Sequence, residues 1–172
     1  MSKPLPPNAV RFRSLAENET HVLRKMLYIA LFVRPGETPF PATILDKPEL
    51  AKYISDWNSR PLDIAVVAER NGTIVGLAWG RTFSTDNPSY GFISEDIPEI
   101  TVAVLANYRN QGIGRSLLQQ LEEAYKQTEA TALSLSVDQL SPAKRLYSRF
   151  GFSIYEEAGT AYTMRKLLPR KT

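Results

Sequence analysis

The sequence contains no cysteine and only one histidine, His21, among its 172 residues. The lack of cysteine excludes disulfides, thiolate metal ligands and a cysteine nucleophile, and it is compatible with a reducing compartment. A single histidine cannot build a histidine-based metal cluster. We therefore expect a protein without a bound metal ion.

Long apolar runs and a strong excess of one charge are missing as well. No stretch of about 18 apolar residues occurs, which argues against a membrane-spanning helix. The N-terminal MSKPLPPNAV lacks the apolar core of a secretory signal. The net charge of +3 is well below that of a dedicated nucleic-acid binder. We expect a cytoplasmic protein that binds neither membranes nor nucleic acids.

The sequence instead has the length and composition of one compact domain, residues 1–172, with 43% hydrophobic residues to form a core. Asn18 is the expected N-cap of the first helix, and Asn71-Gly72 is the expected hairpin turn. The order of elements predicts a mixed α/β fold that contains a parallel strand–helix–strand unit. Apolar periodicity predicts strands at 10–15, 63–69, 73–83, 99–105, 131–137, 152–156 and 160–168, and helices at 16–33, 47–58, 113–127 and 141–152.

The segment TVAVLANYRNQGIGRSLLQQLEEAY (101–125) places Gly112 and Gly114 in a short turn between an apolar strand and an amphipathic helix. The first N–H groups of a helix are unpaired, and the helix dipole makes this end positive. Such an end binds phosphate when glycine lets the ligand approach the backbone. An ordinary tight turn is the alternative, and the glycines alone do not decide between the two.

Three phosphate-binding patterns can be compared with this turn. A P-loop needs Gly-Lys-Ser/Thr, which is absent, and a dinucleotide-binding turn needs a third glycine where Leu117 stands. The third pattern, R/Q-x-x-G-x-G/A, is matched throughout by residues 109–114. About 30 residues downstream, a second pattern, A-x-x-L-Y-x-x-x-G-F, is matched by Ala143, Leu146, Tyr147, Gly151 and Phe152.

With these two motifs, the chain resembles the GNAT superfamily of N-acetyltransferases over residues 60–168, whereas residues 1–60 agree with it only in the order of elements. The resemblance implies an α/β fold with a central, twisted, mixed sheet of about six or seven strands flanked by about four helices. It also implies that strands 99–105 and 131–137, the fourth and fifth, splay apart.

The resemblance implies acetyl-CoA as cosubstrate and no metal. The pantetheine arm would lie between the splayed strands, and the backbone of the glycine turn would hold the pyrophosphate. The cofactor-binding residues implied in this way are Val102, Ala103, Val104, Arg109, Asn110, Gln111, Gly112, Ile113, Gly114, Arg115, Ser116 and Tyr147.

The reaction implied by the resemblance is direct attack of a primary amine on the thioester. Tyr147 matches the general acid that protonates the departing thiolate, although a packed helix tyrosine is the alternative. Glu99 matches the general base, although a solvated loop carboxylate is the alternative. Asp138 is a weaker candidate for the base, and His21 is expected on the surface or in a groove.

The acceptor is a small-molecule or a peptide or protein amine that the sequence does not identify. Leu140 stands where many family members have asparagine, which puts one cofactor contact in doubt. A catalytically silent acyl-CoA-binding sensor or scaffold is the second reading, and the resemblance allows a homodimer. The acceptor site is expected among Tyr28, Phe32, Phe40, Trp57, Phe83, Tyr90 and Phe92, with Glu37, Asp46, Glu95 and Asp96.

Overall fold

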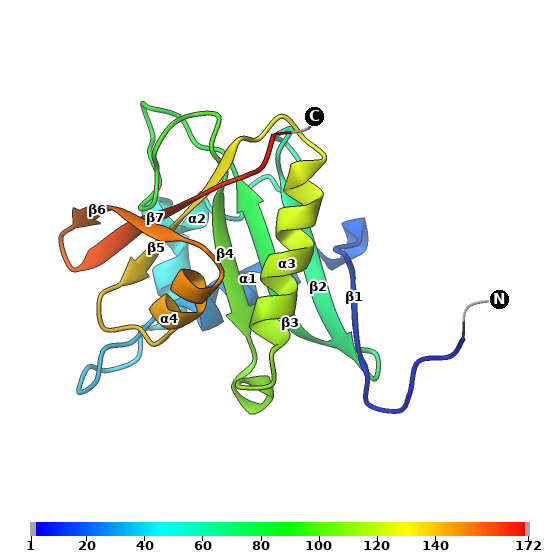
Figure 1. Ribbon diagram of the computed structural model, residues 1–172. Coiled ribbons are helices and arrows are strands. Elements are labelled where there is room, and N and C mark those ends of the chain that lie inside the picture. Colours follow the sequence, from blue (N-terminus) through cyan, green and yellow to red (C-terminus); the bar gives the residue numbers. More distant parts are fainter. Residues whose placement is uncertain (1–2, 171–172) are drawn as a thin grey trace.

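The computed structural model describes residues 3–170 (Figure 1). One sheet holds its seven strands in the order β1-β2-β3-β4-β5-β7-β6. Neighbouring strands are antiparallel except β4 and β5, which are parallel, so the predicted mixed α/β sheet is confirmed. The strands are β1 (Val10–Ser14), β2 (Ile64–Arg70), β3 (Thr73–Arg81), β4 (Glu99–Val104), β5 (Ala132–Asp138), β6 (Ser153–Ala158) and β7 (Ala161–Leu167).

Helices cover both faces of the sheet, with α3 and α4 in front and α1 and α2 behind in the view of Figure 1. The helices are α1 (Val22–Ala30), α2 (Pro48–Ala51), α3 (Ile113–Lys126) and α4 (Ala143–Arg149). Within residues 3–170 there are also three 3₁₀ turns, namely η1 (Glu17–Glu19) before α1, η2 (Ala42–Asp46) between α1 and α2, and η3 (Ala106–Tyr108) between β4 and α3. On the front face the core is formed by leucines of α3 such as Leu117 and Leu121, and on the back face by Leu23 and Met26 of α1.

The first two helices differ from the prediction. Helix α1 has His21 as its N-cap rather than Asn18, because Asn18 lies inside the preceding turn η1. The second helix ends at Ala51 and not near residue 58, and turns follow it. Asp56 and Asn58 have φ angles of 51° and 73°, which an α-helix does not allow.

Local turn chemistry is confirmed elsewhere. Asn71 and Gly72 have φ angles of 50° and 77°, as the tight hairpin between β2 and β3 requires. Gly151, with φ of 103°, follows the C-terminal end of α4, a position that favours glycine. At the other end of α4 the N-cap is Pro142, and the Ser141 hydroxyl accepts a hydrogen bond from the Ala143 N–H at 3.3 Å.

A buried ion pair attaches the irregular segment 52–58 to the sheet. The side chains of Arg81 on β3 and Asp63 are 1% and 0% exposed, and two hydrogen bonds of 3.0 and 2.7 Å join them. The Arg81 guanidinium also donates to the carbonyls of Lys52 at 2.9 Å and Ser55 at 2.7 Å. The charge of the Arg81 guanidinium is paired with Asp63, and its remaining N–H groups donate to backbone carbonyls. The pair therefore fixes segment 52–58, which has no regular secondary structure.

Removing one partner of this pair should destabilise the protein strongly. We expect Arg81→Met to lower the free energy of unfolding by about 3 to 5 kcal/mol, because Asp63 would remain buried without a counter-charge. Arg24→Met removes a pair with Asp46 whose side chains are 50% and 64% exposed. This control should cost about 1 kcal/mol or less. Urea denaturation measures both, and equal losses for the two variants would contradict the assignment.

Candidate active site

Strands β4 and β5 separate almost as soon as they meet. Their only register pair within residues 3–170 is Glu99 with Ser134, next to a hydrogen bond of 2.9 Å from the Ser134 N–H to the Pro98 carbonyl. Figure 1 shows β5 leaving β4 toward the lower left while β4 continues downward. The splay expected between the fourth and fifth strands is therefore present.

The direction of the β4 backbone decides which of its groups face this splay. The Pro98 carbonyl points to β5, whereas the Leu105 N–H donates to a carbonyl of β3 at 2.9 Å. Because backbone polar groups alternate along a strand, those of Val102 and Val104 point toward β5. The Val104 carbonyl accepts a hydrogen bond from Arg109 Nε at 3.1 Å. Hence β4 presents strand backbone that β5 does not pair.

The two glycines of the turn before α3 have different roles. Gly112 has φ of 80°, and a Cβ added there would meet no atom within 4 Å. Gly112 thus adopts the left-handed conformation that glycine favours, and the space beside its Cα is open. A Cβ on Gly114 would lie 3.3 Å from a methyl carbon of Leu146 and 3.9 Å from one of Val104. Gly114 thus allows α4 and β4 to pack against the start of α3.

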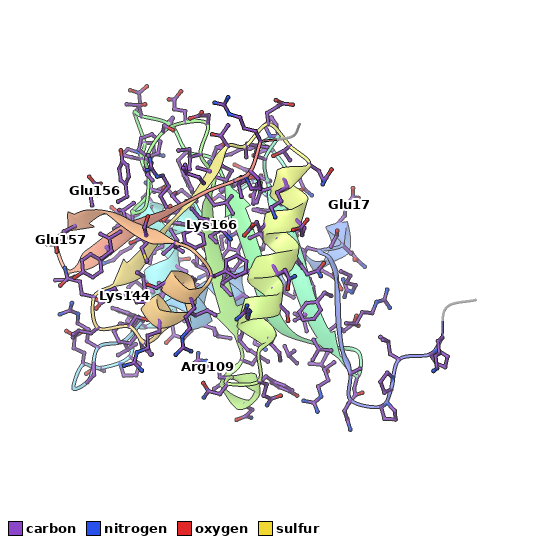
Figure 2. All side chains as sticks on the ribbon, in the orientation of Figure 1. Glu17, Arg109, Lys144, Glu156, Glu157 and Lys166 are labelled. Atoms are coloured by element: carbon purple, nitrogen blue, oxygen red, sulfur yellow. The ribbon has the colours of Figure 1, made fainter. Side chains whose placement is uncertain are left out.

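The N-terminus of α3 is available to a ligand. Its N-cap, Gly112, provides no side-chain hydrogen bond. The first intrahelical bond runs from the Ser116 N–H to the Gly112 carbonyl at 3.1 Å, so the N–H groups of Ile113, Gly114 and Arg115 precede the helical ladder. Asn110, Gln111 and Arg115 are exposed. Figure 2 shows Arg109 on the turn into α3 and Lys144 on α4.

Glu99 is buried at the start of β4 with only 3% of its surface exposed, so it is not a solvated loop carboxylate. Its Oε1 accepts a hydrogen bond from the Gly91 N–H at 2.8 Å, and the Tyr53 hydroxyl lies 3.1 and 2.9 Å from Oε1 and Oε2. Burial raises the pKa of Glu99 to about 7, although these donors partly oppose the rise. The nearby Ser89 hydroxyl also lowers this pKa, although within residues 3–170 it makes no hydrogen bond of ordinary geometry.

Tyr53 and Gly91 are functional candidates that the sequence did not reveal. Tyr53 follows the short helix α2 and is 46 positions from Glu99, and Gly91 lies in a loop without regular structure. Neither residue belongs to a recognisable motif, and their proximity depends on the packing of α2 and this loop against β4. No signal in the sequence pointed to them.

Tyr147 lies on α4 and is half-buried, with its ring 6.1 Å from that of Phe152. Burial raises the pKa of its hydroxyl to about 12. Within the described part of the chain this hydroxyl has no hydrogen-bond partner, so it does not cap a backbone group. Tyr147 packs with the core on the α3 face, whereas Glu99 is bonded to Tyr53 of the core on the α1 face. The two candidate catalytic groups thus lie on opposite faces of the sheet.

The weaker candidates for a base are occupied or peripheral. Arg34 binds both carboxylate oxygens of Asp138 at 2.9 and 3.1 Å, and this pairing lowers the pKa of Asp138. His21 is exposed at the start of α1. Leu140 is exposed in the turn before α4 and borders a depression there with Lys144, where it offers no polar contact.

The aromatic residues expected around the acceptor separate into two groups. Phe83 is buried in the core, and Trp57 packs against the guanidinium of Arg81. Tyr28 and Phe40 instead line a cavity of about 330 Å³ that also borders Arg109. Neither Glu99 nor Tyr147 lines this cavity. The remaining expected acceptor residues are Phe32, Glu37, Asp46, Tyr90, Phe92, Glu95 and Asp96, of which the four acidic residues and Tyr90 are exposed.

Two further features concern the whole described chain. Among residues 3–170, no group of three or more histidine, cysteine, aspartate or glutamate side chains is arranged to hold a metal ion. Within the same residues, no helix is both long and apolar enough to cross a membrane.

The raised pKa of Glu99 predicts a specific dependence of stability on pH. A carboxyl whose pKa is about 7 when folded and 4.5 when unfolded stabilises the fold below the unfolded value and loses this contribution as pH rises through 7. Between about pH 5 and pH 8, the parent should lose on the order of 3 kcal/mol of unfolding free energy relative to Glu99→Gln. Denaturation at several pH values measures this difference. Parallel curves would show that Glu99 titrates normally.

The comparisons with known proteins agree with this geometry. The model of the GNAT acetyltransferase family matches residues 30–152. No curated protein is significantly similar in sequence. Among solved structures, PaiA N-acetyltransferase from Thermoplasma acidophilum in complex with coenzyme A has a TM-score of 0.68 at 15% identity, covering 92% of this chain and 99% of its own.

Two more solved structures share the fold. A GNAT-family acetyltransferase from Streptococcus pneumoniae has a TM-score of 0.66 at 20% identity and covers 94% of this chain and 100% of its own. YncA from Salmonella typhimurium, solved with acetyl-CoA, has a TM-score of 0.67 at 17% identity and covers 95% and 96%. Because the family model spans well over half of the chain, the protein belongs to the GNAT family of acetyltransferases.

Proposed function

We propose that the protein transfers the acetyl group of acetyl-CoA directly to a primary amine of a small-molecule or peptide acceptor, with Glu99 as general base and Tyr147 as general acid. The observation that carries this proposal is the parting of β4 and β5 beside an uncapped helix N-terminus. The structural relatives solved with coenzyme A and with acetyl-CoA support the choice of cosubstrate.

The residues present suit acetyl-CoA. Unpaired N–H groups at a helix start, next to a positive dipole end, bind the oxygens of a pyrophosphate. These are the N–H groups of residues 113–115, and the open space at Gly112 lets the phosphates approach them. The backbone groups of Val102 and Val104 are turned to where an amide-bearing pantetheine arm would pair with them. Ala103 directs its backbone to Leu77 of β3 and holds the strand in place.

The reaction requires two proton transfers. Glu99 accepts a proton from the incoming ammonium, and its raised pKa makes it a stronger base than an ordinary carboxylate. The amine nitrogen then forms a bond to the acetyl carbonyl carbon, and the bond from that carbon to sulfur breaks. Tyr147 gives its proton to the departing sulfur, and the second proton lost by nitrogen restores the phenol through solvent. The products are the N-acetylated amine, coenzyme A with a free thiol, and a proton released from Glu99.

One observation favours the alternative of a silent acyl-CoA-binding module. Glu99 is covered by the Tyr90–Gly91 turn and by Tyr53, so no amine reaches it unless that turn moves. A panel of amines incubated with acetyl-CoA, with free thiol monitored and products identified by mass spectrometry, separates the two functions. The silent module binds acetyl-CoA and releases no thiol with any amine.

The role of Tyr147 is tested by Tyr147→Phe. We expect kcat to fall by about 100-fold or more, because the departing thiolate loses its proton donor, while the Kd for acetyl-CoA changes little. Thiol release under saturating acetyl-CoA measures kcat. Tyr155→Phe is the control, because Tyr155 is an exposed tyrosine on β6. A Tyr147→Phe variant as active as the parent would exclude the general-acid role.

The phosphate-binding turn is tested by Gly112→Ala. Gly112 and Gly72 have φ angles of 80° and 77°, and no atom lies within 4 Å of a Cβ added at either position. Alanine therefore costs a similar strain of about 1 kcal/mol at both positions. We expect only Gly112→Ala to weaken coenzyme A binding, by about tenfold, because the methyl group would project into the phosphate site. Calorimetric titration measures the affinities. Equal affinities of the two variants would place the pyrophosphate elsewhere.

A further inference from the structure

Tyr53 is a buried tyrosine whose hydroxyl lies against a buried carboxylate. Only 6% of Tyr53 is exposed, and its hydroxyl lies 2.9 Å from Oε2 and 3.1 Å from Oε1 of Glu99. The phenol donates a hydrogen bond to the carboxyl group, and this bond is charge-assisted when Glu99 is ionised. Both burial and the neighbouring Glu99 raise the pKa of Tyr53, so the phenol stays protonated and remains a donor.

The same hydroxyl is bonded to the loop that precedes β4. It accepts a hydrogen bond from the Tyr90 N–H at 3.0 Å, and the next residue, Gly91, donates its N–H to Glu99 Oε1 at 2.8 Å. The Tyr90 and Tyr53 rings are stacked, with centroids 6.5 Å apart and planes 16° from parallel. Loop and carboxylate are thus joined both directly and through Tyr53.

Gly91 occupies the space between the two parting strands. A Cβ on Gly91 would lie 2.5 Å from Glu99 Oε1 and 2.7 Å from the carbonyl carbon of Leu135 on β5. Both distances are too short for any side chain, so this position accepts only glycine in the observed arrangement. The Gly91 N–H holds the place at Oε1 that an N–H of an acceptor ammonium would take.

Tyr53 is anchored independently of this loop. Its carbonyl accepts a hydrogen bond from the indole of Trp79 at 3.2 Å. The neighbouring carbonyls of Lys52 and Ser55 bind the buried guanidinium of Arg81. Because Trp79 and Arg81 belong to β3, these contacts hold the backbone around Tyr53 without the help of the loop.

We propose that Tyr53 is the positioning residue of Glu99: its hydroxyl holds the carboxylate in place and stabilises its charge when Glu99 is ionised. The proposal rests on the proposed function, in which Glu99 is the base. Among the charged residues around Glu99, Lys52 lowers its pKa, and Arg81 is its cross-strand partner on β3, with a charge that is paired with Asp63. Lys52, Arg81 and Asp63 remain unchanged in the test.

The test is the pH profile of Tyr53→Phe. Without its donor, ionised Glu99 is less favoured, so the acidic limb of kcat/KM should move to higher pH by about one unit. At pH values above the acidic limbs of both proteins, kcat/KM of the variant should approach that of the parent. The KM for acetyl-CoA should stay the same. Loss of packing alone would lower the rate equally at all pH values and leave the limb in place.

Tyr125→Phe is the matched control. Tyr125 is also buried, and its hydroxyl donates to the Leu62 carbonyl at 2.9 Å within the core on the α3 face. The acidic limb of kcat/KM of Tyr125→Phe should coincide with that of the parent. The proposal would be overturned if the acidic limb of kcat/KM in Tyr53→Phe stayed at the pH of the parent. An equal shift of this limb in Tyr53→Phe and Tyr125→Phe would also overturn it.

The design also separates failure of this inference from failure of the proposed function. A parent that releases no thiol with any amine would refute the proposed function. In that case the interaction between Tyr53 and Glu99 can be measured without turnover, from the pH dependence of the free energy of unfolding. Each tyrosine variant is measured with Glu99 and with Glu99→Gln, and the difference between the two curves is the contribution of Glu99. Its midpoint should be at higher pH in Tyr53→Phe than in Tyr125→Phe, and equal midpoints would refute a role of Tyr53 in holding the charged carboxylate.

Discussion

The hydrogen bonding between β4 and β5 ends after one residue pair, and the arrangement of the site depends on that constraint. In a closed sheet, the backbone of Val102 and Val104 would be used by β5. Here a loop residue, Gly91, lies between Glu99 and Leu135 where the strands begin to part. The strands therefore separate toward the end at which α3 begins, and the unpaired strand backbone leads to the unpaired helix N–H groups.

The parting would also allow groups from two separate cores to serve the one proposed reaction. A continuous sheet separates the side chains of its two faces, because neighbouring residues point to opposite sides. Tyr147 packs with the α3 core and Glu99 is bonded within the α1 core. An acyl group held between β4 and β5 would be reachable from both. The proposed acid and base thus need no common helix or loop.

The irregular segment 52–58 connects the buried ion pair with the candidate base. Its backbone is fixed by the buried pair of Arg81 with Asp63, and it carries the tyrosine that holds Glu99. Short helices such as α2 are marginal by themselves, so such a segment depends on tertiary contacts for its order. A buried charge at this point stabilises the geometry of the carboxylate as well as the fold.

Local chemistry in the sequence determined the strands, the helix α3, the Asn71-Gly72 hairpin and the glycine turn, because periodicity, turn residues and two motifs act over a few neighbouring positions. It was wrong where distant contacts prevail, because α2 ends early and Asn18 caps no α-helix. Only the tertiary structure placed Tyr53 and Gly91 on Glu99, because that contact joins a helix end, a loop and a strand far apart in sequence. The two sequence motifs are local, whereas the environment of Glu99 was decided by long-range packing.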